Sequence, residues 1–138
     1  MSDENFDPVI YDLYARTTYT VRDESGQEVF FNLKSAKELP LLRRKQFAVV
    51  TAWNPMNRRL SDHENEVRNE QLESELQKTP YVFYPTIGVL GEHFEKSFTV
   101  EKIPESEAVR LGSLFEQYAI LINDSLGCRL VRCPPKSV

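Results

Sequence analysis

The sequence has no excess of basic residues and no long apolar run. It carries 17 Lys and Arg against 21 Asp and Glu, which gives a formal net charge of −4. Since proteins that bind nucleic acid usually present a basic surface, this balance argues against a nucleic-acid partner. No apolar stretch approaches the roughly 20 residues of a membrane-spanning helix, and the acidic, polar residues 1–5 do not resemble a signal peptide. We therefore expect a cytoplasmic protein that does not enter a membrane.

Histidine and cysteine are also scarce, with two of each. His63 and His93 are not spaced as a metal-binding pair, so we expect no metal site. Cys128 and Cys133 fall in a predicted strand, where a spacing of five residues puts the two side chains on opposite faces. That geometry suits neither a disulfide nor a shared metal, and we interpret both as reduced structural thiols. Because there is no glycine-rich phosphate loop and no Walker-type lysine, we expect no cofactor.

The composition predicts one globular domain. The 138 residues include eight Phe, six Tyr and one Trp, which is more aromatic content than disordered chains have. A chain of this length can bury a core without disulfides or metals. We find no internal repeat, low-complexity tract or linker. We therefore predict a single domain over residues 1–138, with an ordered core at about 6–133 and short polar termini.

Local signals predict the first half of the fold. Asp7-Pro8 is a typical helix start, with Asp as the cap and Pro in the first turn. Segments 17–22 and 28–33 are rich in β-branched and aromatic residues and should form a hairpin. Ser35 can cap a short helical segment that extends to Leu42 and is interrupted by Pro40. The apolar run 47–53 predicts a central strand, which Asn54-Pro55 should end.

The second half contains the best-defined helix. Ser61 and Glu64 form a capping box, which predicts a helix at 62–78 that stops before Pro80. Gly88 and Gly91 are expected to bracket a turn. The other predicted elements are strands at 81–90, 94–103, 118–122 and 128–133 and a helix that begins at Pro104-Glu105-Ser106. The fold class is therefore α+β, a mostly antiparallel mixed sheet with two or three helices packed on it.

The apolar face of helix 62–78 continues as a polar face. At about 100° per residue, Asn65 and Asn69 share a stripe with Leu72 and Leu76. The leucines must face the core, so the two carboxamides should face the end of strand 47–53. A buried amide without a hydrogen-bond partner costs about 1–3 kcal/mol. The partner is either the backbone of loop 54–60 or a bound ligand, and the sequence leaves both open.

The loop before this helix also favours a ligand site. It leads from a buried strand into a helix N-terminus, whose free amides and partial positive charge attract anions. Arg58 and Arg59 add fixed cations that can hold a phosphate or a carboxylate. The alternative interpretation is a solvated basic loop.

The segment after Gly91 offers a second polar face. With a period of two, His93, Glu95, Ser97 and Thr99 lie on one side of the strand. Side chains at i and i+2 are about 6.5–7 Å apart, too far for direct proton relay. Hydrolysis by Glu95 with Ser97 or His93 is therefore the weakest of our hypotheses. Glu95 by itself could act as a base or as an acceptor for a ligand amine.

Several segments together resemble a small bacterial family that is catalogued only as a domain of unknown function. The resemblance covers about residues 13–133, and its most specific part is the Thr-Ala-Trp-Asn-Pro block at 51–55 followed by the helix asparagines. The other segments are Glu64-Asn65, Asn69 with Leu72, Glu95-Lys96-Ser97-Phe98 and Phe115-Glu116-Gln117-Tyr118-Ala119. The resemblance implies a stand-alone bacterial cytoplasmic domain, and it assigns no activity to it. It places polar family positions at Thr51, Asn54, Asn65, Asn69, Glu95, Ser97 and Gln117.

Three functional hypotheses follow. The first is that a small anionic or nucleotide-like ligand binds at the end of strand 47–53 and the start of helix 62–78, with or without catalysis. Its candidate site residues are Thr51, Asn54, Arg58, Asn65, Asn69, Glu95 and Gln117. The second is a non-enzymatic protein-interaction or regulatory module, with a protein partner and a purely structural polar cluster. The third is the hydrolase.

Overall fold

In the computed structural model, which describes residues 6–22, 25–33 and 46–135, seven strands form one sheet in the order β2-β1-β4-β5-β3-β6-β7. Every paired strand is antiparallel. The strands are β1 (Thr18–Arg22), β2 (Glu28–Phe31), β3 (Phe47–Val50), β4 (Phe83–Leu90), β5 (His93–Glu101), β6 (Ala119–Asp124) and β7 (Gly127–Arg132). The helices are α1 (Pro8–Arg16), α2 (Asp62–Gln77) and α3 (Glu105–Leu114), with a short 3-10 turn η3 (Pro55–Asn57). The predicted α+β class is confirmed, and the helical segment expected at 35–42 lies outside the described residues.

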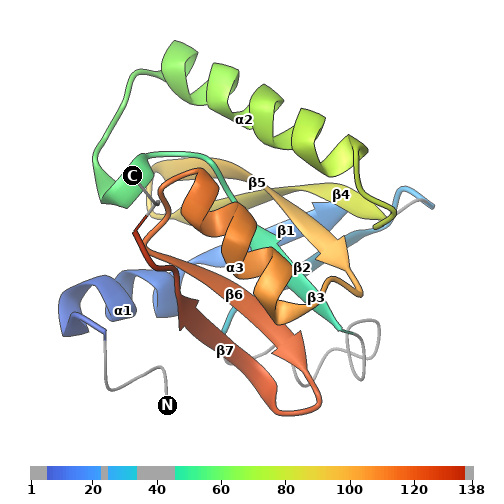
Figure 1. The fold of residues 1–138 in the computed structure, drawn as a ribbon. Helices are drawn as coiled ribbons and strands as arrows, with labels where there is room; N and C mark the ends of the chain where they lie inside the picture. Colours follow the sequence, from blue (N-terminus) through green and yellow to red (C-terminus); the bar gives the residue numbers. More distant parts are fainter. Residues whose placement is uncertain (1–5, 23–24, 34–45, 136–138) are drawn as a thin grey trace.

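The helices lie on both faces of the sheet (Figure 1). α2 and α3 pack on one face, over a core that includes Val50, Leu76, Val100 and Leu111. α1 lies against the other face, where its half-buried side chains cover a second core of aromatic and aliphatic residues. The second core includes Phe31, Phe47, Val49, Leu121 and Leu130. Each face of the sheet therefore has its own apolar cluster.

β3 is an interior strand of the sheet, as its apolar run predicts, although β5 is the middle strand in the order. β3 pairs with β5 on one side and with β6 on the other, and all four of its residues are buried. It ends at Val50, three residues earlier than predicted, because the Thr51 side chain redirects the chain. Thr51 Oγ1 donates to the carbonyl oxygen of Lys96 at 2.7 Å and accepts the N–H of Trp53 at 3.1 Å. These bonds turn the chain away from the sheet toward η3.

The capping signals in the sequence predicted where α1 and α2 begin. Asp7 Oδ1 accepts the N–H of Val9 at 2.9 Å, and Pro8 occupies the first turn of α1. Ser61 Oγ accepts the N–H of Glu64, and Glu64 Oε1 accepts the N–H of Ser61, each at 3.1 Å. The predicted capping box of α2 is therefore confirmed.

Gly88 lies inside β4, so the expectation that it borders a turn is wrong. Of the two glycines, Gly91 lies in the β4–β5 turn, together with Glu92. A Cβ atom on Gly88 would lie 3.2 Å from Cγ2 of Thr17 and 3.2 Å from Cε1 of Tyr19. The absence of a side chain lets these two residues pack directly on the strand. Gly88 also pairs with Glu95 on β5, so no β4 side chain covers that carboxyl.

Cys128 and Cys133 form no disulfide and lie on opposite faces of the sheet, as predicted. Cys133 is buried in the core under α3, whereas Cys128 packs against the cluster under α1. Within the part of the chain that the structure describes, no helix combines the length and the apolarity needed to cross a bilayer.

Candidate functional site

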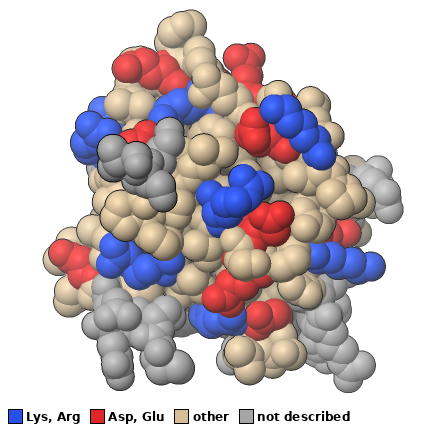
Figure 2. Space-filling view, viewed as in Figure 1, with Lys and Arg blue, Asp and Glu red and all other residues tan. Residues whose placement is uncertain are grey.

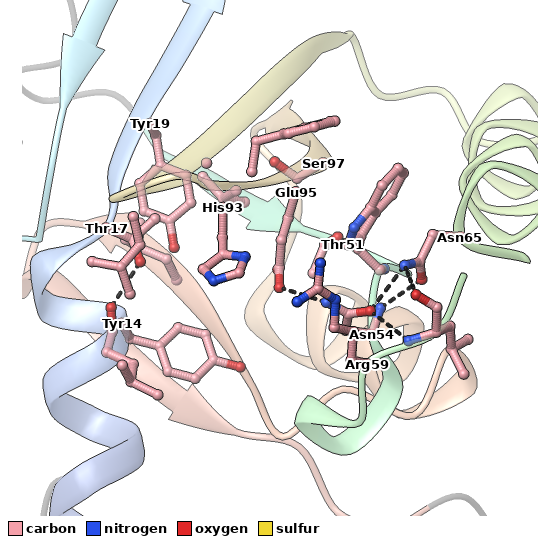
Figure 3. Close-up of a pocket in the computed structure, with 18 of the residues that line it drawn as sticks. Tyr14, Thr17, Tyr19, Thr51, Asn54, Arg59, Asn65, His93, Glu95 and Ser97 are labelled. Atoms are coloured by element: carbon pink, nitrogen blue, oxygen red, sulfur yellow. Dashed lines mark hydrogen bonds between the residues drawn. The ribbon is translucent and has the colours of Figure 1, made fainter. Parts of the chain in front are cut away.

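A cavity of about 490 Å³ opens on the side of the sheet that carries α1. A volume of this size lies within the roughly 300–1,000 Å³ of small-molecule sites. Its walls come from α1, β1, β4, β5, the end of β3 and the loop that leads into α2 (Figure 3). The polar lining includes Tyr14, Thr17, Tyr19, Thr51, Asn54, Arg59, Asn65, His93, Glu95 and Ser97. The apolar lining includes Leu13, Trp53, Leu60 and Phe94.

Alternation along β5 delivers three of the lining residues. His93, Glu95 and Ser97 all line the cavity, and Phe98 and Val100 point into the core on the opposite face. The period of two predicted this division for these residues. It also put Phe94 on the core side, which is wrong, because Phe94 is 49% exposed and lines the cavity at the start of the strand. The polar face of β5 is therefore the floor of a cavity rather than an open surface.

Glu95 is a half-buried residue that lines the cavity. Figure 3 shows it between His93 and Asn54. Asn54 Nδ2 donates to Glu95 Oε2 across 3.4 Å, and within residues 6–22, 25–33 and 46–135 Glu95 has no ion pair. Desolvation raises the pKa of Glu95 above its ordinary value, and the weak Asn54 bond offsets this only in part. The site thus holds a carboxyl that no described residue neutralises.

Asn54 is held in one orientation by its neighbours. Its Oδ1 accepts the N–H of Leu60 at 3.0 Å and Nδ2 of Asn65 at 2.9 Å. Because the oxygen faces α2, the amide nitrogen faces Glu95. The backbone of Asn54 has φ of 46°, in the left-handed region that Asn tolerates better than most residues. Its N–H donates to Asn65 Oδ1 at 2.8 Å, so the loop supplies the partners that Asn65 needs.

Two tyrosine hydroxyls enter the site from α1 and β1. Burial is the main cause that raises the pKa of Tyr14 and of Tyr19, and the charge of Glu95 raises both further. Both hydroxyls therefore stay protonated and can donate. Tyr14 Oη reaches the carbonyl oxygen of Ala119 across a long 3.4 Å, and the Tyr19 hydroxyl has no hydrogen-bond partner among the described residues. A ligand could accept from either.

Three predicted site residues lie outside the cavity lining. Arg58 is exposed, and its backbone N–H donates to the carbonyl oxygen of Pro55 at 2.9 Å. Asn69 Oδ1 is buried on α2 and has no hydrogen-bond partner among the residues that the structure describes. Gln117 is buried between α3 and β6. The predicted residues that the structure brings together are Thr51, Asn54, Asn65, His93, Glu95 and Ser97.

Gln117 and Arg68 fix the start of the cavity loop from outside. Gln117 Nε2 donates to the carbonyl oxygen of Trp53 at 3.1 Å, and Arg68 Nε donates to that of Ala52 at 2.7 Å. Arg68 Nη2 also donates to the carbonyl oxygen of Phe115. These bonds join the loop to α2 and to the end of α3, so both side chains position the site without lining it.

The N-terminus of α2 is less open to an anion than its sequence indicated. The capping box occupies backbone groups there, and Asp62 and Glu64 already supply negative charge in the first turn. Asp62 itself lines the cavity, and the cation beside it is Arg59 rather than Arg58. The lining therefore carries more carboxyls than guanidinium groups.

The three candidate catalytic residues share the cavity but do not form a nucleophile–base pair. Ser97 Oγ donates to the carbonyl oxygen of Thr86 at 3.3 Å, and His93 forms no hydrogen bond with any described residue. An activated serine requires a base within about 2.6–3.2 Å. In the described ranges no three His, Cys, Asp or Glu side chains are placed to hold a metal ion.

Sequence reasoning missed Tyr14 and Tyr19. Period-two alternation along segment 17–22 places Tyr19 on the same side as Val21, which is a usable signal for an inward-facing ring. No local signal says that α1 folds back over that side and brings Tyr14 with it. The α1 wall of the cavity is therefore a product of tertiary packing.

A comparison with protein-family models matches residues 50–120, slightly more than half of the chain, to a family described as a protein of unknown function (DUF3293). This agrees with the expected family of unknown function. The matched region contains Asn54, Asn65 and Glu95, whereas Tyr14 and Tyr19 precede it. No curated protein and no solved structure matches the chain.

Proposed function

Because the chain belongs to the DUF3293 family, whose function is unknown, we propose from its geometry that it binds a small molecule in the cavity between α1 and the sheet. The observation that carries this proposal is the unneutralised carboxyl of Glu95. A partly buried charge without a partner costs free energy, which folding alone gives no reason to retain. A titratable group with a perturbed pKa inside a concave, partly apolar cavity is typical of a binding site.

The lining favours a ligand with a flat apolar part and a polar end. The Trp53 and Phe94 rings form part of the wall, with centroids 6.0 Å apart. Glu95 accepts hydrogen bonds, and the hydroxyls of Tyr14 and Tyr19 donate them. An aromatic or heterocyclic molecule with one or two polar substituents matches this arrangement.

The charge of the lining weighs against the anionic ligand that the sequence suggested. Asp62, Glu92 and Glu95 line the cavity, whereas Arg59 is the guanidinium group in the lining. A phosphate or carboxylate would meet more like charges than opposite ones, which is unfavourable at short range. We propose a ligand without net negative charge. Binding in a bacterial cytoplasm stays a prediction from composition and resemblance.

A second surface supports the alternative of a protein-interaction module. Phe30 on β2 is 58% exposed and Ile87 on β4 is 41% exposed. Both flank Thr20 of β1 in the pairing register, so they lie on the same face of the sheet. Exposed apolar patches often mark protein contacts. On the face seen in Figure 2, acidic and basic side chains are intermixed, which does not favour a nucleic-acid partner.

A thermal-shift screen against a library of small metabolites tests the proposal. A ligand that binds the folded state raises the melting temperature by mass action. His93→Trp narrows the cavity at its exposed rim and should abolish the shift. His63→Trp is the matched control, because His63 is exposed on α2 and does not line the cavity. A hit that survives His93→Trp, or the absence of any hit, would count against the proposal.

A further inference from the structure

The charged groups of the cavity are not equivalent in their surroundings. Arg59, Asp62, Glu92 and His93 are exposed residues, so water can solvate them at the rim. Glu95 is half-buried, which makes it the least exposed of the charged lining residues, and it sits beside the buried Ser97 on the cavity side of β5. The electrostatics of the cavity therefore favour a positive charge next to the Glu95 carboxyl.

We infer that the ligand is a small organic cation, an amine or amidine attached to a flat apolar group, whose charged end pairs with Glu95. This inference rests on the proposed function and specifies its ligand class. Two independent features of the cavity support it: the unused hydrogen-bond acceptor capacity of the Glu95 carboxyl and the aromatic residues in the lining.

The carboxyl of Glu95 has hydrogen-bonding capacity to spare. Its Oε2 accepts the long bond from Asn54, and its Oε1 accepts none from the described residues. The amide of Asn54 cannot turn to satisfy the carboxyl better, because its oxygen is held by Leu60 and Asn65. An ammonium or amidinium group carries several N–H donors and a positive charge, so it can supply the hydrogen bonds and the counter-charge that the described residues do not give Glu95.

The aromatic walls suit the rest of such a ligand. Trp53 and Phe94 both line the cavity, and their ring centroids lie 6.0 Å apart, although Trp53 is only 4% exposed. Ring faces attract cations and stack on flat groups. The hydroxyls of Tyr14 and Tyr19 lie close enough to Glu95 to interact with its charge, and they can accept hydrogen bonds from N–H groups as well as donate.

Other ligand charges fit this cavity less well. An anion would bring a second negative charge toward a carboxyl that has no ion-pair partner in the described ranges. A neutral ligand would leave that carboxyl unneutralised. A cation forms the ion pair inside a partly desolvated site, where charge-assisted hydrogen bonds are stronger than neutral ones.

Three probes that share one carbon skeleton separate these cases: phenethylamine, phenethyl alcohol and phenylacetate. Trp53 is the single Trp of the chain and lines the cavity, so its fluorescence reports occupancy. We expect phenethylamine to bind at least about tenfold more tightly than either other probe. Glu95→Gln should weaken phenethylamine by at least about tenfold and leave phenethyl alcohol unchanged.

Glu92→Gln is the matched control. It removes one carboxylate from the exposed rim and should leave phenethylamine binding within about twofold, since exposed ion pairs contribute little. Equal or tighter binding of the alcohol or the acid would overturn the inference while the proposed function stands. Equal losses in Glu95→Gln and Glu92→Gln would also overturn it, because the general charge of the rim would then explain the preference. If none of the three probes binds, the inference fails, and the thermal-shift screen judges the proposed function separately.

Discussion

Asn54 and Asn65 exchange two hydrogen bonds across the loop that leads into α2. The Asn54 N–H donates to Asn65 Oδ1 at 2.8 Å, and Asn65 Nδ2 donates to Asn54 Oδ1 at 2.9 Å. The side-chain nitrogen Nδ2 of Asn54 then faces Glu95. The first turn of α2 therefore controls the position of the only amide that contacts the cavity carboxyl among the described residues.

Asn65→Ala should lower the free energy of unfolding by about 1–3 kcal/mol, because the buried N–H of Asn54 loses its acceptor. Asn69→Ala is the matched control on the same helix. Its oxygen is buried without a partner, so its removal should change stability by less than about 1 kcal/mol. Urea unfolding of both variants measures the difference. Equal losses would show that helix packing, rather than the Asn54–Asn65 pair, determines the effect.

Glu95→Gln should be at least as stable as the wild type at neutral pH. Desolvation raises the pKa of Glu95 in the folded state above its ordinary value of 4.5. The folded state therefore binds this proton more tightly, and the associated stability is present at low pH and lost as the pH rises through the folded-state pKa. The variant keeps the neutral form at every pH, so its advantage should grow from acidic to neutral pH. Urea unfolding across that range tests this, and a constant difference would contradict the desolvation of Glu95.

Gly112→Ala should destabilise the protein although alanine is the better helix former. The added Cβ would lie 2.5 Å from Sγ of Cys133 and 2.9 Å from Cγ2 of Ile120. Overpacking of this kind costs about 1–3 kcal/mol, more than the roughly 1 kcal/mol that helix propensity returns. Thermal unfolding should show a lower melting temperature, partly restored when Cys133→Ala is added. A stabilised single variant would show that α3 can move away from β7 at little cost.

The two thiols should differ in reactivity. Burial raises the pKa of Cys133 to about 12, and the residue lies in the core, so it should resist alkylation at neutral pH. Cys128 is half-buried on β7 and should react first. Mass spectrometry after brief iodoacetamide treatment should find one modified Cys in the folded protein and two in urea. Modification of Cys133 at the rate of Cys128 would contradict its placement.

Local signals in the sequence predicted the elements that depend on neighbouring residues. The capping pairs Asp7-Pro8 and Ser61 with Glu64 fix helix starts through backbone amides a few residues away. The apolar run from Phe47 to Val50 has no polar face, which only a central strand can bury. The alternation along β5 likewise predicted that His93, Glu95 and Ser97 share a face, but it failed for Phe94 at the exposed start of the strand.

The cavity itself could not be predicted in this way. Its α1 wall depends on long-range contacts, such as the bond from Tyr14 to Ala119 over 105 residues. The stripe that predicted inward-facing asparagines was right in direction, since Asn65 is buried and the half-buried Asn69 has a buried Oδ1. It could not show that Asn65 forms hydrogen bonds with Asn54, whereas Asn69 Oδ1 forms none with a described residue. The two asparagines are one helical turn apart, and the geometry of the loop determines which of them finds a partner.

Proton NMR of the two imidazoles tests the central claim most directly, because His93 lines the cavity and His63 lies outside it. Titration with phenethylamine, phenethyl alcohol and phenylacetate should shift the His93 ring signals and leave His63 in place, with saturation at the lowest concentration for phenethylamine. If no probe moves His93 more than His63, the cavity between α1 and the sheet is not the binding site that we propose.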